Sequence, residues 1–130
     1  DEAAEAAVRA VEALVEGVAQ AVCQEPRLRL LIVGGRIAGY NEVTFDRFVE
    51  GVREAGAGDA VEFTDWVGLE ESRRLMAQRC QAGLSIDRFT YEAVLGSRTR
   101  IVNFLASGRP VISTATTELA EELVREGFVI

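Results

Sequence analysis

The chain has 130 residues, which is the size of one domain and enough for an ordinary hydrophobic core. Its composition, 48% hydrophobic and 27% charged, is that of a folded protein rather than a disordered tail. The net charge of −7 disfavours binding to nucleic acid or to anionic membranes, because such binders are normally basic. No apolar run approaches the roughly 18 residues of a transmembrane segment, so we expect none.

The residue types present narrow the possible chemistry. All 14 basic residues are arginine, so catalysis by histidine or lysine is excluded within this chain. Cys23 and Cys80 are far apart and outside any CxxC pattern, so we expect no zinc site. We interpret both cysteines as reduced, buried, small apolar residues in preference to a disulfide pair. The sequence shows no catalytic nucleophile and predicts no metal.

The ends of the chain suggest a piece of a longer protein. The sequence begins without an initiator methionine, opens on a helical pattern and closes on Phe128-Val129-Ile130, which resembles the start of a strand. We therefore expect residues 1–130 to be a single domain excised from a longer, two-domain protein. No signal peptide is recognisable, and we expect a cytoplasmic location.

The first half of the chain predicts two helices and two strands. Residues 1–25 form an amphipathic helix that ends at Pro26, with valines recurring on one face at Val8, Val11, Val15, Val18 and Val22. Residues 28–33 form a strand whose apolar character favours burial on both faces. Thr44 is expected to cap a second helix that ends at Gly56 and presents Phe45, Phe48, Val49 and Val52. Residues 61–64 form the next strand.

The second half continues the alternation of helix and strand. Helices are predicted over 69–79, 98–107 and 117–126, and strands over 82–86, 111–114 and from 128 onward. On the helix 98–107 the core-facing side is expected to carry Ile101, Val102, Leu105 and Ala106. This alternation predicts an α/β fold: a Rossmann-like, three-layer α/β/α arrangement with a mostly parallel sheet. Ligands of such sheets bind outside the carboxyl ends of the strands.

Two of the loops at that edge carry glycine and tryptophan. Gly34 and Gly35 directly follow a strand, and glycines there let backbone N–H groups approach a phosphate or a ring. The pattern is not GxGxxG, and a simple tight strand exit is an equal alternative. Trp66, followed by Val67, is the one tryptophan of the chain and could wall a pocket for a planar base. Packing of Trp66 over the sheet edge is the alternative.

The loop over 87–98 and the helix after it form a cationic island. Residues 87–109 hold four arginines against Asp87 and Glu92, a local charge of +2 in an acidic chain. Positive charge at a helix N-terminus suits a phosphorylated ligand. The alternative is that Arg98 and Arg100 simply form ion pairs with Glu92 and Asp87.

Several hydroxyl and amide side chains lie beside that island. Ser97 is expected to cap the helix, and Thr99 and Asn103, four residues apart, share one polar face. Four more hydroxyls follow the next strand within residues 113–117. We interpret Thr116 or Thr117 there as a helix cap in preference to a ligand contact.

Three segments together resemble a known family. LRLLIVGG at 28–35, VEFTDWVGLEESRRLMAQRCQAGLSI at 61–86 and SRTRIVNFLASGRPVISTATTELAEELVREG at 97–127 are similar to the C-terminal domain of group 1 glycosyltransferases of the GT-B fold. The resemblance covers residues from about 8 to 130 and is sharpest over 98–114. There an aromatic residue is followed by the family's Ala-x-Gly-x-Pro-Val-Ile pattern.

The resemblance implies a set of donor contacts. In the family this domain binds a nucleotide-sugar, here expected to be a UDP- or GDP-sugar, and uses no separate cofactor. Gly34 and Gly35 match the glycine pair after the family's second strand, and Trp66-Val67 matches the loop that faces the nucleobase. Some members share the Arg98-Thr99-Arg100 helix start.

The same comparison shows one departure from the family. The glutamate that grips the donor ribose is replaced by Asn103, and its paired glutamate, eight residues earlier, is replaced by Leu95. Asparagine can hydrogen-bond a hydroxyl, but less strongly than a carboxylate. Glu92 is expected to take over part of that work.

The function implied is donor binding in a glycosyltransferase that passes a sugar to a saccharide, lipid-linked or small-molecule acceptor. Chemistry would be electrostatic and metal-independent, and the chain alone, without its N-terminal partner domain, would be inactive. Two alternatives stay open: a scaffold or dimerisation module that has lost nucleotide binding, and an NAD-binding domain, which the glycine loop fits poorly.

Overall fold

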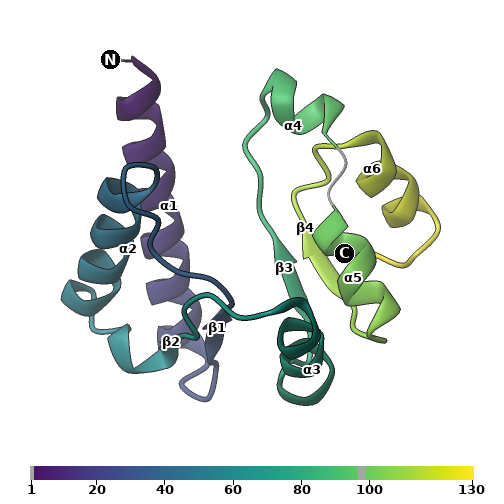
Figure 1. The fold of residues 1–130 in the computed structure, drawn as a ribbon, viewed down its shortest axis with the longest axis horizontal. Helices are drawn as coiled ribbons and strands as arrows, with labels where there is room; N and C mark the ends of the chain where they lie inside the picture. The colour runs from purple at the N-terminus through teal and green to yellow at the C-terminus, as the bar shows by residue number, and fades with distance from the viewer. Residues whose placement is uncertain (1, 97–98) are drawn as a thin grey trace. The chain divides into compact units, whose positions relative to one another are not determined.

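The computed structural model describes residues 2–96 and 99–130. The chain divides into two compact units, Asp1–Val67 and Gly68–Ile130, and each is described by itself. In both units helices alternate with short strands (Figure 1). Within the described residues the strands pair in parallel, β1 with β2 and β3 with β4. The α/β class, with the parallel strands of a Rossmann-like fold, is confirmed.

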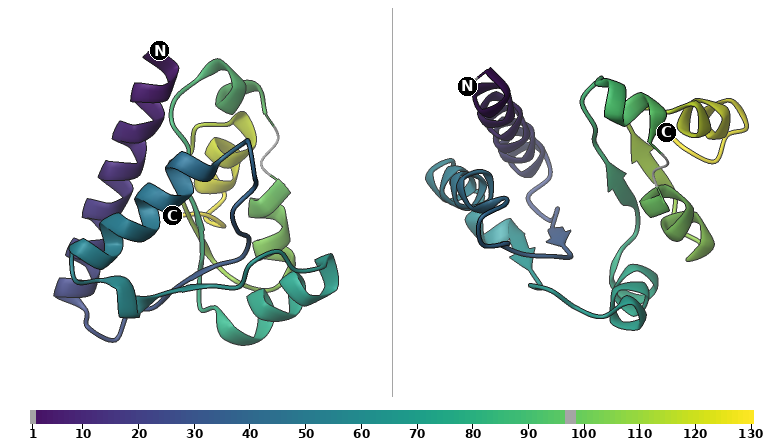
Figure 2. Two further views of the ribbon diagram at one scale, coloured as in Figure 1. Left: turned by 60° about the vertical axis from the view of Figure 1, so that its left-hand side comes forward. Right: turned by 45° about the horizontal axis from the view of Figure 1, so that its top comes forward.

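The first unit is built from two long helices and one strand pair. Its elements are α1 (Glu2–Gln24), β1 (Leu30–Ile32), α2 (Glu42–Glu54), the short 3₁₀ helix η1 (Gly58–Ala60) and β2 (Val61–Phe63). In the pairing, Leu30 lies opposite Val61 and Ile32 opposite Phe63. Helices α1 and α2 lie side by side in all three views (Figures 1 and 2).

The core of this unit lies between the helix pair and the strands. Its buried residues come from α1, α2 and the turn before η1: Val18, Phe48, Val52 and Ala57. Phe63 of β2 meets the rings of Phe45 and Phe48 edge-on, at centroid distances of 5.2 and 6.1 Å. Burying each large apolar side chain contributes about 1.5–3 kcal/mol. The predicted valine stripe of α1 therefore faces the core.

The second unit carries the remaining elements. These are α3 (Leu69–Arg79), β3 (Gly83–Ser85), α4 (Tyr91–Leu95), α5 (Thr99–Ala106), β4 (Val111–Ser113) and α6 (Glu118–Arg125). Val111 also bridges Val129 in parallel, so the chain end extends the sheet where a strand was predicted from residue 128. The buried core consists of Ile101, Val111, Ala120 and Val129, from α5, β4, α6 and the chain end.

The structure corrects several local expectations. Helix α2 begins at Glu42, so Thr44 lies in its first turn and donates to the Asn41 carbonyl instead of capping it. Strand β1 is half-buried along its length rather than fully buried. Cys23 is exposed and Cys80 half-buried, and both are free, so their expected burial is wrong.

Helix α4 was not predicted, and the face of α5 differs from the expected one. Thr90 starts α4 by accepting a hydrogen bond from the Ala93 N–H at 3.1 Å, a cap that shortens the expected 12-residue loop. On α5, Val102 and Ala106 are exposed, whereas Phe104 packs toward the core. The reason is Gly83, since the absent side chain leaves the space over β3 that the Phe104 ring fills.

We predict that Gly83→Ala destabilises the protein. A Cβ at this position would lie 2.3–2.6 Å from the Phe104 ring, which leaves no room for a methyl group. Overpacking of this kind costs about 1–3 kcal/mol of the free energy of unfolding, measurable by urea denaturation. Gly17→Ala is the control, because nothing lies within 4 Å of its Cβ position and alanine favours the helix by up to about 1 kcal/mol. Equal stability of the two variants would contradict the packing of Phe104 on β3.

Candidate functional site

In the first unit the exits of the two paired strands touch each other. Because β1 and β2 run in parallel, their carboxyl ends lie at the same edge. The Gly34 N–H donates to Thr64 Oγ1 at 3.4 Å, and Gly34 forms an antiparallel bridge with Asp65. The predicted glycine loop and the predicted tryptophan loop are thus brought together.

Close backbone approach explains the glycines of this exit. Gly34 has a φ of +136°, which only glycine adopts readily. A Cβ on Gly35 would lie 2.3 Å from Asp65 Oδ1 and 3.3 Å from Asp65 Cα. Asp65 itself has a φ of +62°, and its Oδ1 accepts a hydrogen bond from the Trp66 N–H at 3.0 Å. The side chain of Asp65 therefore fixes the turn that presents Trp66.

Trp66 lies beside the glycine loop with most of its surface open. Its side chain is 62% exposed, and its indole Nε1 donates to the Arg36 carbonyl at 3.4 Å. Ring atoms lie 3.9–4.0 Å from the Cβ position of Gly34. Val67, the next residue, is half-buried. An exposed indole held at a strand exit offers a flat surface for an aromatic ligand.

Side chains from the start of α2 hold the rest of the glycine loop. Asn41 accepts a hydrogen bond from the Ile37 N–H at 2.6 Å and donates to the Gly35 carbonyl at 3.3 Å. Arg36 bonds to Asp46 and Glu42, and the hydrogen bonds to Asp46 raise the pKa of its guanidinium above the ordinary value. Arg36 is thus a structural cation of the loop, already neutralised by two carboxylates.

In the second unit one threonine joins the exits of β3 and β4. Thr114 Oγ1 accepts from the Asp87 N–H at 3.0 Å, and the Thr114 N–H donates to the Ser85 carbonyl at 3.2 Å. Ala115 follows with a φ of +51°, a left-handed conformation unusual for alanine. Thr117 then caps α6 by accepting from the Ala120 N–H at 3.1 Å, as its sequence position predicts.

The cationic island is described in part. Arg100 Nη2 lies 4.0 Å from the carboxylate of Asp87, whose side chain is only 13% exposed. This is the ion pair that the sequence raised as an alternative for Arg100. Thr99 is the exposed first residue of α5, and Asn103, one turn later, is half-buried. The side chain of Glu92, and Ser97 and Arg98 altogether, lie outside the described residues.

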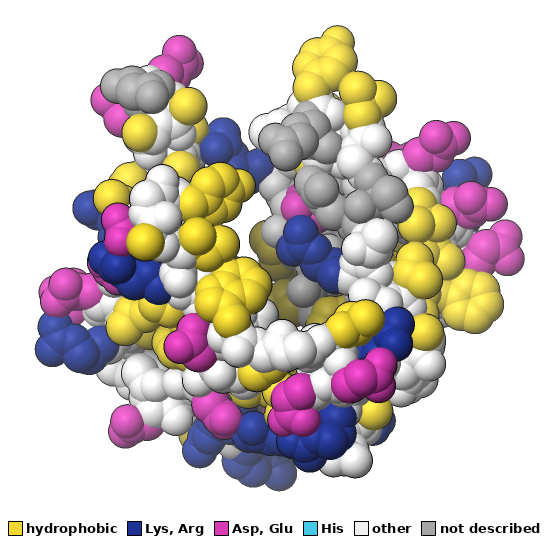
Figure 3. All heavy atoms as spheres, viewed as in Figure 1, with side chains coloured by type: hydrophobic (Ala, Val, Ile, Leu, Met, Phe, Trp, Pro, Cys, Tyr) yellow, Lys and Arg dark blue, Asp and Glu magenta, His cyan; other side chains and the backbone are white. Residues whose placement is uncertain are grey.

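Arg73 and Arg74 of α3 do not offer a comparable anion site. Arg73 pairs with Glu70 and Arg74 with Glu71, one turn apart on the helix. The hydrogen bonds from Arg74 lower the pKa of Glu71. Basic and acidic side chains lie next to each other at the lower edge of the space-filling view, where α3 lies (Figure 3). These two pairs form a solvated, charge-balanced face of α3.

Sequence reasoning did not predict the backbone contacts of three residues that shape these exits: Asn41, Asp65 and Thr114. Each acts on backbone atoms of a neighbouring loop, and that role depends on strand pairing. Local signals existed for two of them, since Asn precedes a helix and Asp precedes a turn. Among the described residues, no three His, Cys, Asp or Glu side chains gather as a metal site would require.

Comparison with known protein families matches residues 3–130 to the group 1 glycosyl transferases. The chain belongs to this family. A comparison with curated proteins and one with solved structures found no match. In the described part of this glycosyl transferase domain, no helix is both long enough and apolar enough to cross a bilayer.

We predict that Gly35→Ala displaces Trp66. The added Cβ would collide with Asp65, whose carboxylate fixes the Trp66 turn. Since Trp66 is the one tryptophan of the chain, its fluorescence emission and its quenching by acrylamide report directly on this loop. Gly68→Ala is the matched control, because nothing lies within 4 Å of its Cβ position and its φ of −66° suits alanine. Unchanged Trp66 fluorescence in Gly35→Ala would contradict the described contact.

Proposed function

We propose that this group 1 glycosyl transferase domain binds the nucleotide part of a nucleotide-sugar donor, a UDP- or GDP-sugar, within a GT-B enzyme. The observation that carries the proposal is the exposed indole of Trp66 beside Gly34, at the carboxyl ends of two parallel strands. This edge is where sheets of this class bind ligands. The strand-exit loops and the helix start that follows one of them are therefore the proposed donor site.

Trp66 and the glycine loop after β1 are proposed to receive the nucleobase. The flat face of the indole stacks on a base, and backbone groups of Gly35 and Val67 supply hydrogen bonds to base or ribose. Gly34, whose N–H already donates to Thr64 Oγ1, contributes by leaving room for the indole beside it. Two features support this assignment: Asp65 already fixes the turn that presents Trp66, and Thr64 and Asn41 already hold the backbone of Gly34 and Gly35 in place. A preformed loop lowers the ordering cost of binding.

The start of α5 is proposed to receive the diphosphate. Its N-terminal N–H groups and the Arg98-Thr99-Arg100 sequence suit an anion, because the helix dipole and the guanidinium charge act in the same direction. Ser97 and Thr99 would donate hydroxyl hydrogen bonds, and Asn103 and Glu92 would hold ribose hydroxyls. Asp87, paired with Arg100, would keep that guanidinium oriented.

The catalytic contribution of this domain would be electrostatic. Stabilising the charge that develops on the leaving diphosphate needs fixed positive groups but neither a nucleophile nor a metal from this chain. The acceptor, a saccharide, lipid-linked or small-molecule hydroxyl, would be held by a second, N-terminal domain of the same cytoplasmic enzyme. The chain by itself would bind nucleotide without transferring sugar.

Two observations favour a second candidate, a scaffold that has lost donor binding. Leu95 occupies the position of one family glutamate, and its side chain is 79% exposed. The Asp87–Arg100 contact also shows that one cation of the island already has a partner. A scaffold would bind no nucleotide at all, so titration separates the two functions.

We predict that the chain binds UDP or GDP more tightly than NAD in calorimetric titration. Nucleotide should also change Trp66 fluorescence, since the base would lie against the indole. Arg98→Ala is expected to weaken binding at least tenfold, the loss of one charge-assisted contact to phosphate. Arg125→Ala, which removes the same charge from the end of α6, is the control and should bind as the parent does.

Absence of binding by UDP, GDP and NAD, to this chain and to the longer protein that contains it, would favour the scaffold. Tight NAD binding without a response to UDP or GDP would instead favour an NAD-binding domain. Equal weakening by Arg98→Ala and Arg125→Ala would mean that net charge, rather than the start of α5, drives the interaction.

A further inference from the structure

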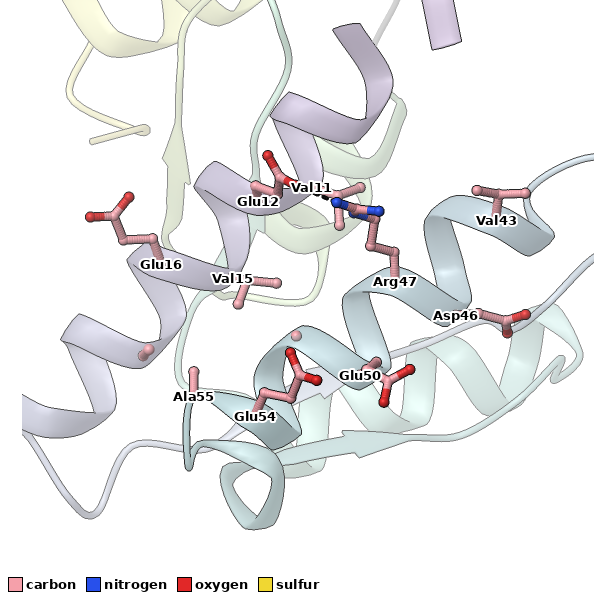
Figure 4. Close-up of a pocket in the computed structure, with 12 residues that line it drawn as sticks. Val11, Glu12, Val15, Glu16, Val43, Asp46, Arg47, Glu50, Glu54 and Ala55 are labelled. Carbon is pink, nitrogen blue, oxygen red and sulfur yellow. Dashed lines mark hydrogen bonds and ion pairs between the residues drawn. The ribbon is translucent and has the colours of Figure 1, made fainter. Parts of the chain in front are cut away.

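A groove runs between α1 and α2 in the first unit, on residues that the donor proposal does not use. Its volume is about 750 Å³. The close-up in Figure 4 shows Val15 of α1 pointing toward α2 across this groove. The residues that line it are Val11, Glu12, Val15, Glu16, Ala19, Val43, Asp46, Arg47, Glu50, Gly51, Glu54 and Ala55.

The floor of the groove is apolar, and the two helices come close together there at a glycine. A Cβ on Gly51 would lie 2.9 Å from Val15 Cγ2, so α1 and α2 approach closely there. Val11, Ala19 and Ala55 continue the apolar lining on either side. At the N-terminal end of α2, Val43 is 71% exposed, a large apolar side chain without cover in this structure.

The rims of the groove are acidic on both helices. Five of the lining residues are carboxylates and one, Arg47, is a cation. Arg47 pairs with Glu12 at 2.6 Å, while Asp46 and Glu50 pair with arginines outside the groove. Glu16 on α1 accepts a hydrogen bond from the neutral Gln20 amide at 3.3 Å, and no ion pair among the described residues reaches Glu16 or, on α2, Glu54. One uncompensated carboxylate therefore stands on each rim.

We propose that this groove is a docking surface for a basic amphipathic helix of a protein partner. The apolar floor suits one aliphatic face of such a helix, and Glu16 and Glu54 suit lysine or arginine on its two flanks. Helix α2 follows the groove over residues 43–54, about 18 Å at 1.5 Å per residue. That length fits a partner helix of about three turns. The proposal is independent of donor binding.

The test uses a synthetic helix as the probe. A peptide of about 14 residues carries leucines at i, i+3, i+4 and i+7 spacing and lysines elsewhere, and a second peptide replaces every lysine by glutamate. We expect calorimetry to show binding of the lysine peptide to this chain and none of the glutamate peptide. Amide shifts in NMR should map to Val15, Ala19 and Val43.

Charge variants test whether the acidic rims of the groove contribute to peptide binding. The double variant Glu16→Gln and Glu54→Gln should weaken binding of the lysine peptide about fivefold, the effect of losing two partly exposed ion pairs. The double variant Glu121→Gln and Glu122→Gln makes the same change in net charge on α6 and should bind as the parent does. Circular dichroism of both variants checks that α1 and α2 stay folded.

Four results would overturn the proposal. Equal affinity for the two peptides would mean that the acidic rims play no part. Equal loss in the two double variants would assign the interaction to net charge alone. Concentration-dependent dimerisation with shifts at Val15 and Val43 would assign the groove to a second copy of the chain. Binding to lipid vesicles with no binding of the lysine peptide would assign it to a membrane surface.

Discussion

Parallel pairing of neighbouring strands is the constraint on which the rest of the structure depends. In each unit two strands that run in the same direction must be joined by a helical crossover, and their carboxyl ends then meet at one edge. The pairings of Leu30 with Val61 and of Gly83 with Val111 set the register. The residues proposed to contact the donor follow one of these strands or lie in the first two turns of the next helices. Because the paired strands run in the same direction, the loops that follow them lie side by side within each unit.

Close packing at glycine positions turns this topology into defined loops and cores. Gly35 admits the Asp65 carboxylate, Gly51 admits Val15 and Gly83 admits the Phe104 ring. At each of the three positions a methyl group would meet its neighbour at less than 3.0 Å. The first contact shapes the Trp66 turn, the second brings the two outer helices together and the third seats α5 on β3. Interiors are packed densely enough for one methyl group to matter at such points.

The sequence predicted the order and type of the long elements because their patterns are local. The valine stripe of α1 and the apolar runs of the strands each identify an element without knowledge of its neighbours. Helix α4 escaped prediction because it is a single capped turn, too short for a periodic signal. Val102 was predicted on the inward face of α5. Phe104 lies inward instead, because Gly83 on β3 leaves space for its ring.

For the candidate site, residue type and position were predictable but partners were not. Gly34 and Trp66 were identified from their places after strands, yet their mutual contact depends on the parallel register. Arg100 illustrates the opposite case, because its charge favoured a ligand contact and the structure pairs it with Asp87. Family membership over residues 3–130 makes this a group 1 glycosyl transferase domain. The assignment of donor contacts to individual residues is our proposal.

The most direct test of the account is an NMR titration of isotope-labelled chain with UDP and with GDP. We expect the largest shifts at the amides of Gly34 and Gly35, at the Trp66 indole N–H and at the start of α5, with the amides of α1 unchanged. Shifts confined to α1 and α2, or no shift at the strand exits at saturating nucleotide, would contradict donor binding at this edge.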